Sequence, residues 1–363
     1  MKILKYIILG LFILNLPGVV LVGIGSTLGS VLSYLSFFLL IFYYLNTGQG
    51  KPNAWLFYIG ILYFGISGFQ VYTGDFRGVL ILLVKYLIMV ICANEFYKKV
   101  TVKEMLYCLM VGAISIVFQA VFLSNLYGRY SGFYLNPNAA GQICLFGLAL
   151  TYAINDKKSR QILQVLFTIA GLVTFSRTFI ILWLLINVIS IKINIKNAKT
   201  LVIGFLMFLG ILTYGELFNL KGLRFKQFQA FLNSDANVSQ VGGESRSETW
   251  SRFYEHIYEF PFFGGGFGKF QGGGVELIGP HNTYLLIIGE AGIFPLLLTL
   301  IFFGLLLYEA YKVFPTKPYL LMIVLISVIY LFTSHTLFTS YIKLSIIIFA
   351  YQHIKAERKH SLL

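Results

Sequence analysis

Long runs of apolar residues recur along almost the whole chain, and they restrict its fold more than any other feature. Several approach the ~20 residues of α-helix that span a hydrocarbon core about 30 Å thick. Backbone N–H and C=O groups find no water inside lipid, so each run must satisfy them within its own helix. Charged residues make up only 12% of the chain, against about 25% in soluble domains. The sequence therefore predicts an all-α integral membrane protein.

The apolar runs predict about twelve transmembrane helices and one large outer loop. The predicted spans are 3–22, 28–45, 54–72, 78–93, 104–124, 139–154, 161–175, 177–191, 199–217, 282–311, 318–333 and 341–353. The chain then divides into helices one to nine within 1–217, a loop with an amphipathic helix at 218–281, and helices ten to twelve with a tail at 282–363. The first run lacks a small-residue cleavage site, so we expect a retained helix rather than a removable signal peptide.

The basic residues in the connections predict the orientation. With a cytoplasmic N-terminus, more than half of the 28 lysines and arginines fall in cytoplasmic segments, which satisfies the positive-inside rule. This topology needs two short helices at 161–175 and 177–191, because a single helix would place Arg177 near mid-bilayer at a cost of roughly 2.5–3.5 kcal/mol. The loop 218–281 is then extracytoplasmic, and both chain ends are cytoplasmic.

The net charge of +14 would indicate nucleic-acid binding in a soluble protein. In a membrane protein, basic residues at helix ends instead set the topology and contact anionic headgroups. We therefore expect membrane lipids, and no nucleic acid, as partners. Cys92, Cys108 and Cys144 lie in apolar runs without a CxxC spacing, so neither a zinc site nor a disulfide framework is predicted.

Arginines on the predicted outer side need an explanation, because the positive-inside rule disfavours them there. Arg77 has Asp75 two residues away, and we expect a local ion pair. Arg129 and Arg177 have no acidic neighbour in the sequence. A guanidinium group stays ionised and binds phosphate through two parallel hydrogen bonds. These two arginines therefore indicate either a lipid-linked phosphate or diphosphate, or simple contact with headgroups.

Two segments of the predicted outer face carry polar motifs. Asn136-Pro137-Asn138 is typical of a turn that starts a helix, since Asn caps well and Pro begins helices; Asn138 either caps or faces a polar cavity. Residues 245–260 predict an amphipathic helix with Trp250, Phe253, Tyr254 and Ile257 on its apolar face and Arg246 at its start. The glycine-rich stretch 261–274 follows, and it either approaches a ligand closely or forms a flexible loop.

A histidine opens the tenth predicted span. His281-Asn282 follows Pro280, and a neutral imidazole at this boundary is able to remove a proton from a hydroxyl group. We expect no metal, because no second ligand stands at metal-binding spacing. Glu290 lies about two turns further along the span, where a charged group indicates a partner or a function. His335, near the last outer turn, is interpreted as structural.

The order of these motifs resembles the O-antigen ligase family, whose relatives include O-antigen polymerases and bacterial O-oligosaccharyltransferases. The motifs that carry the resemblance are Arg129…Asn136-Pro-Asn138, Thr174-Phe-Ser-Arg177, Arg246-x-x-x-Trp250, Pro261…Gly264–Gly268 and His281-Asn282-x-Tyr-Leu…Glu290-x-Gly292. The predicted topology, with one large periplasmic loop before the last few spans, is similar too. The similarity covers about residues 125–310 and leaves the first five spans without a signature. The stretch 262–274 is richer in glycine than the usual family form.

The resemblance implies a metal-independent glycosyltransferase of the bacterial inner membrane with a periplasmic active site. Its donor would be a glycan on undecaprenyl diphosphate, and its acceptor a sugar hydroxyl of the lipid A core or another glycan. Arg177 and Arg246, together with Arg129, match the positions expected to bind the donor diphosphate, and His281 matches the catalytic base. Asn138, Ser176, Asn282 and Glu290 match supporting positions. No cofactor is implied.

Three other functions stay open at the level of sequence. A polysaccharide polymerase or a protein O-oligosaccharyltransferase would use the same donor with a different acceptor. A transporter or flippase of lipid-linked sugar belongs to a different class. It is disfavoured because Lys85 and Glu290 are the main ionisable residues inside spans, and no inverted repeat with broken helices is evident.

Overall fold

The structure, a computed structural model, describes residues 1–361 except 49, 124–128 and 215–245. The helices of the first half are α1 (Lys2–Ile13), α2 (Leu16–Gly23), α3 (Ser26–Thr47), α4 (Ala54–Ser67), α5 (Phe76–Lys98), α6 (Val102–Phe122), η1 (Gly132–Tyr134), α7 (Pro137–Thr151) and α8 (Lys157–Leu172). Those of the second half are α9 (Arg177–Ile193), η2 (Ile195–Asn197), α10 (Ala198–Tyr214), α13 (Arg246–Ser251), α14 (Tyr254–Glu259), α15 (Thr283–Ala291), α16 (Ile293–Lys312), α17 (Pro318–Leu331) and α18 (Tyr341–Ser361). The all-α prediction is confirmed for these residues.

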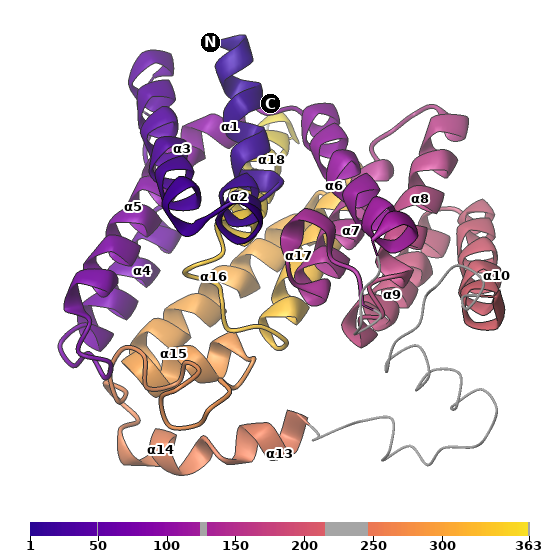
Figure 1. The fold of residues 1–363 in the computed structure, drawn as a ribbon. Coiled ribbons are helices and arrows are strands. Elements are labelled where there is room, and N and C mark those ends of the chain that lie inside the picture. Colours follow the sequence, from indigo (N-terminus) through magenta and orange to yellow (C-terminus); the bar gives the residue numbers. More distant parts are fainter. Residues whose placement is uncertain (49, 124–128, 215–245, 362–363) are drawn as a thin grey trace.

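The two ends of the described chain lie on the same side of the bundle, and α13, α14 and α15 lie on the opposite side (Figure 1). Contacts among basic connections define the first side, which we call the basic end. There Lys5 Nζ lies 2.6 Å from Glu104 Oε1 and 3.4 Å from the carbonyl oxygen of Lys99. His353 of α18 reaches the carbonyl of Val100 at 3.0 Å. We call the opposite side, with α13 and the start of α15, the loop end.

Helix α7 forms the centre of the bundle. Every residue from Ala140 to Thr151 is buried, and the helix packs against α6, α8, α9 and α17. A helix that is apolar on every face is stable either inside a protein or in lipid, and here neighbouring helices cover it. At Gly147, an added Cβ would lie 2.1 Å from the ring of Phe167. Helices α7 and α8 therefore pack closely at this glycine.

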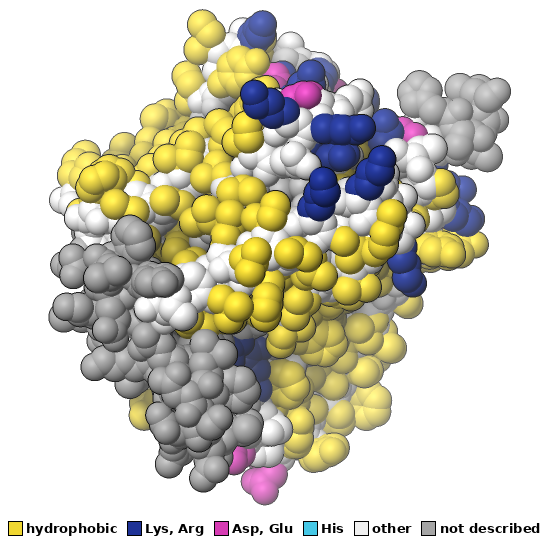
Figure 2. Space-filling view, turned by 90° about the vertical axis from the view of Figure 1, so that its right-hand side faces the viewer, with side chains coloured by type: hydrophobic (Ala, Val, Ile, Leu, Met, Phe, Trp, Pro, Cys, Tyr) yellow, Lys and Arg dark blue, Asp and Glu magenta, His cyan; other side chains and the backbone are white. Residues whose placement is uncertain are grey.

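The outer surface of the bundle is apolar, as expected for contact with lipid. Figure 2 shows hydrophobic side chains across the middle of one face, with Lys and Arg gathered toward the top. Among the described residues, five helices are long and apolar enough to cross a membrane, or six if the bent pair α1–α2 counts as one span. Helices α4 and α17 are shorter apolar helices. The fold is consistent with a helical membrane protein.

Two predicted spans are broken in the structure. The span 3–22 is divided into α1 and α2, which meet at an angle of 58°. The division occurs because Asn15 is left-handed (φ 53°) and Pro17 lies in the first turn of the second helix. The span 282–311 is divided at Gly292 (φ 81°) into α15 and α16. Each of these two predicted spans is therefore a pair of helices in the structure.

The predicted division at Arg177 is confirmed, since α8 ends at Leu172 and α9 begins at Arg177. The amphipathic helix predicted at 245–260 is present as two short helices, α13 and α14. Phe253 and Ile257 of its apolar face are buried, whereas Tyr254 is exposed. The first part of the predicted loop, 218–245, lies outside the described residues.

Candidate functional site

The candidate site lies at the loop end. It is formed by the starts of α7, α9, α13 and α15 and by the turn before α9. Asn136, Ser176 and Asn282 cap α7, α9 and α15 by accepting backbone N–H bonds. Asn282 is buried, and its Oδ1 accepts from Tyr284 N at 2.9 Å and Leu285 N at 3.3 Å. Each cap satisfies amides that a helix start otherwise leaves unpaired. These residues therefore fix the directions from which the neighbouring side chains enter the site.

Arg129, Asn138 and Ser176 form one hydrogen-bonded network. Arg129 Nη2 donates to Asn138 Oδ1 at 3.0 Å, and Ser176 Oγ donates to the same oxygen at 3.0 Å. Arg129 Nε also donates to the carbonyl of Thr174 at 3.3 Å. Asn138 does not cap α7, because Asn136 performs that role. The network joins the start of α7 to the turn before α9.

The turn before α9 holds Arg177 at the surface. Phe175 is buried in a left-handed conformation (φ 48°), which is uncommon for a residue with a bulky side chain. Ser176 then caps α9 through a 3.4 Å bond from Phe179 N. Arg177 is the first residue of α9, and its side chain is exposed. The Arg129 bond to Thr174 and the Ser176 cap together stabilise this strained turn.

Arg246 lies within electrostatic reach of both Arg177 and His281. Desolvation and the nearby charge of Arg177 lower the pKa of Arg246, against the opposing effect of Tyr330. Desolvation and the charge of Arg246 also lower the pKa of His281 below its ordinary value of 6.5. Like charges repel, and an anion bound between Arg177 and Arg246 would relieve this repulsion.

Trp250 connects the helix that carries Arg246 to the segment that carries His281. Its Nε1 donates to the carbonyl of Pro280 at 2.9 Å, directly before His281. Residues i and i+4 lie on the same face of a helix, so Arg246 and Trp250 project from the same side of α13. The bond therefore sets the position of Arg246 relative to His281.

His281 has a neighbour that the sequence interpretation left out of the site. The rings of His281 and His335 have centroids 5.1 Å apart, and His281 adopts a left-handed backbone (φ 48°). Burial lowers the pKa of His335 to about 4, with contributions from His281 and Lys343. Among the described residues, the buried Nδ1 of His335 has no hydrogen-bond partner. Lys343 is itself held by Ser334 and Thr336.

Glu290 organises the glycine-rich stretch rather than facing the arginines. It is fully buried, and its Oε1 accepts from Gly268 N at 3.0 Å and Phe270 N at 3.1 Å. Its Oε2 accepts from the hydroxyl of Tyr63. Gly264, Gly266 and Gly268 all have positive φ, and an added Cβ on Gly264 would lie 2.3 Å from the Glu290 backbone. The stretch is thus a packed support with a defined path.

This support reaches the histidines through Phe270. The Phe270 ring lies 5.1 Å from that of Phe253, beside the short helices of the loop. An added Cβ on Gly279 would lie 3.1 Å from the Phe270 carbonyl and 3.3 Å from the His335 ring. The lack of a side chain at Gly279 therefore permits the segments of Phe270, Gly279 and His335 to approach one another closely.

The predicted site residues thus fall into two adjoining groups and one support. Arg129, Asn138 and Ser176 share a network, while Arg177, Arg246 and His281 share an electrostatic environment. The expected ion pair of Arg77 with Asp75 is not formed among the described residues. Asp75 instead caps α5 through a 2.9 Å bond from Gly78 N.

No protein-family model matches this sequence, and no curated protein matches it significantly. In the described part of the chain, no three His, Cys, Asp or Glu side chains gather where they could hold one metal ion.

Proposed function

We propose that the protein is an O antigen ligase-like glycosyltransferase that moves a glycan from a polyprenyl diphosphate to an acceptor hydroxyl. The observation that carries this proposal is the grouping of Arg177, Arg246 and His281 at the loop end. The motif resemblance supports the choice of substrate, because the same residues match the donor-binding arginines and the base of that family. The donor is undecaprenyl-diphosphate glycan, and the acceptor is a sugar of the lipid A core.

The chemistry follows from the charges of these groups. The acceptor oxygen forms a bond to the anomeric carbon while the bond from that carbon to the diphosphate oxygen breaks. The diphosphate leaves with both electrons of the broken bond and gains negative charge, which the guanidinium groups of Arg177 and Arg246 stabilise. His281 takes the proton of the attacking hydroxyl, and its lowered pKa keeps the imidazole neutral near pH 7.

The placement of the site supports a lipid-linked donor on the extracytoplasmic side. The cationic groups lie at the loop end, away from the basic connections at the opposite end of an apolar bundle (Figure 1). Under the positive-inside rule the basic end is cytoplasmic. The protein is then an inner-membrane protein with cytoplasmic termini, and the anchored substrates react at headgroup level, where confinement favours their encounter.

A transporter of lipid-linked sugar is the second candidate, because the bent pair α1–α2 is a discontinuous helix of the kind found in transporters. The grouped arginines and histidine favour glycan transfer over transport. Transport leaves the bond between the sugar and the diphosphate intact, so it needs no base beside the arginines. A polysaccharide polymerase and a protein O-oligosaccharyltransferase share the proposed chemistry and differ in acceptor.

The test uses purified protein in lipid with a polyprenyl-diphosphate oligosaccharide and each candidate acceptor. We expect release of free polyprenyl diphosphate, measured by mass spectrometry, both with a chelator and without it. The product distinguishes the three transferases: a ligase places the glycan on the lipid A core, a polymerase lengthens the glycan on its carrier, and an O-oligosaccharyltransferase places it on protein. Arg252→Ala is the matched control, because this arginine lies in the same loop beside Glu276, at 3.9 Å. Movement of intact donor across the bilayer without its cleavage would identify a transporter instead.

A further inference from the structure

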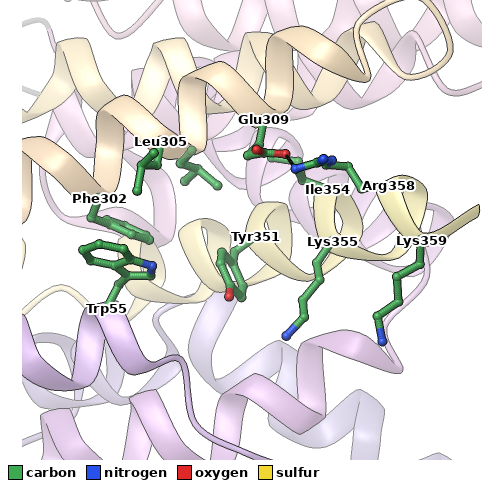
Figure 3. Close-up of a pocket in the computed structure, with 10 residues that line it drawn as sticks. Trp55, Phe302, Leu305, Glu309, Tyr351, Ile354, Lys355, Arg358 and Lys359 are labelled. Carbon is green, nitrogen blue, oxygen red and sulfur yellow. Dashed lines mark hydrogen bonds and ion pairs between the residues drawn. The ribbon is translucent and has the colours of Figure 1, made fainter. Parts of the chain in front are cut away.

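A cavity of about 410 Å³ opens at the basic end, on the opposite side of the bundle from the candidate site. It lies between the start of α4, the second half of α16 and the second half of α18 (Figure 3). Trp55, Phe302, Leu305 and Ile354 contribute apolar lining, and Lys355 and Lys359 contribute charge. We call it the lysine-rimmed cavity. The groups of the candidate site do not line it, so any ligand here is separate from the proposed reaction.

The two lysines lie one turn apart on the same face of α18. Figure 3 shows Lys355 and Lys359 extending in one direction beside Tyr351, whereas Arg358 points to Glu309. Like charges at i and i+4 repel and destabilise a helix. Among the residues that the structure describes, neither lysine lies within ion-pair distance of a carboxylate, and the Glu309 carboxylate is occupied by Arg358. The cavity therefore presents two adjacent cations that an anion would stabilise.

The apolar part of the cavity continues from these lysines toward the lipid-facing surface. The rings of Trp55 and Phe302 lie next to each other in Figure 3. Phe302 and Ile354 are buried, whereas Leu305 is 44% exposed, so the lining opens on the outer side of the bundle. Aromatic residues with a polar edge, such as Trp55 and Tyr351, are typical of the membrane–water boundary. The site thus combines a paired cation with an adjoining apolar groove.

We propose that the lysine-rimmed cavity binds an anionic phospholipid, with its phosphate between Lys355 and Lys359 and an acyl chain along Trp55, Phe302 and Leu305. Charge complementarity selects an anionic headgroup, and the groove selects a ligand that carries a chain. A free phosphate ion would meet only the lysines, and a soluble anionic protein would not fill the groove. Basic pockets between membrane helices at the cytoplasmic side suit such headgroups.

Trp55 provides a direct probe of occupancy. We would reconstitute the full chain in phosphatidylcholine vesicles and add dibrominated phosphatidylglycerol or dibrominated phosphatidylcholine. The difference between wild type and Trp55→Phe isolates the quenching of Trp55. We expect stronger quenching by phosphatidylglycerol than by phosphatidylcholine. Each lysine removed is expected to lower the relative association constant about fivefold, which corresponds to about 1 kcal/mol per basic residue near a membrane surface.

Lys355→Ala/Lys359→Ala should therefore abolish the preference. Lys157→Ala/Lys158→Ala is the matched control, because it removes the same charge from exposed residues that do not line the cavity. Equal quenching by the two lipids, or equal loss in the control, would overturn the proposal. Inorganic phosphate should leave the preference unchanged relative to chloride at equal ionic strength, and displacement by phosphate alone would exclude a lipid-specific site. None of these outcomes depends on glycan transfer, so failure here leaves the proposed function untouched.

Discussion

The imidazole rings of His281 and His335 lie with their centroids 5.1 Å apart, although 53 residues separate them in the sequence. His281 follows the loop, while His335 lies in the turn between α17 and α18. The pKa of each is lowered below 6.5. Both rings are therefore neutral at pH 7, and His281 has the form that a base requires.

His281→Ala should lower the transfer rate by about 10²–10⁴, the usual contribution of a general base. In the wild type, activity should rise with pH, and the midpoint of the rise should lie below pH 6.5, since deprotonation of His281 creates the active form. Arg246→Ala removes a charge that lowers the pKa of His281, so the rising limb of the pH profile should move to higher pH. The measurement is the pH profile of polyprenyl-diphosphate release. His335→Asn should leave the limb in place, because His335 is already neutral above about pH 4.

Arg177→Ala should reduce the rate by about 10²–10³, as for loss of one group that stabilises developing charge. Arg177→Lys should recover only part of it, because an ammonium group keeps the charge but not the planar fork. Single-turnover assays on equal amounts of membrane-inserted protein provide the comparison. Arg77→Ala, an exposed arginine at the start of α5, is the control. Full activity of Arg177→Ala would remove this residue from the mechanism.

Trp250→Phe should keep most of the packing but lose the 2.9 Å bond to Pro280. A hydrogen bond contributes about 0.5–1.5 kcal/mol net, so we expect a two- to tenfold loss of activity. The rising limb of the pH profile should also move to higher pH, because the bond that positions Arg246 relative to His281 is lost. Tyr258→Phe, which alters an 80% exposed side chain of α14, should change neither quantity.

Glu290→Ala should destabilise the glycine-rich stretch. The change leaves the buried amides of Gly268 and Phe270 without an acceptor, at about 1–3 kcal/mol for each. We expect a lower melting temperature in detergent and faster tryptic cleavage after Lys269. Glu276→Ala, in the same segment, removes only a 3.9 Å ion pair with Arg252. Equal protease resistance in the two variants would contradict the structural role of Glu290.

The topology is tested with single introduced cysteines. Tyr258→Cys on α14 should react with a membrane-impermeant maleimide added to intact spheroplasts, whereas Ser159→Cys on α8 should react only after lysis. Both positions are exposed, and the native cysteines are buried or half-buried. Labelling of Ser159→Cys in intact spheroplasts would show that the orientation is the reverse of the proposed one, with the proposed site in the cytoplasm.

Local sequence patterns predicted the helix starts at the site well. Asn136-Pro137 and Ser176-Arg177 mark starts because capping depends on residues within one turn. The break at Asn15 was missed, although Pro17 two residues later was a usable signal. Gly292 was also available as a signal for the break before α16.

Relationships between distant segments were beyond the sequence. The bond of Arg129 to Asn138 joins residues only nine positions apart, and the sequence placed both in one motif. The placement of His335 beside His281, by contrast, depends on how α15 and α17 pack. The role of Glu290 required Tyr63, which lies 227 residues earlier in the chain. A charged residue inside an apolar run predicts that a partner exists, but it does not identify that partner.

Helix α15 has only nine residues, a length of about 13 Å. One end begins at Asn282, next to His281, and the other carries the carboxylate that holds Gly268 and Phe270. Asn282 and Glu290 therefore tie the segment of His281 and the glycine-rich stretch to opposite ends of the same two and a half turns of helix.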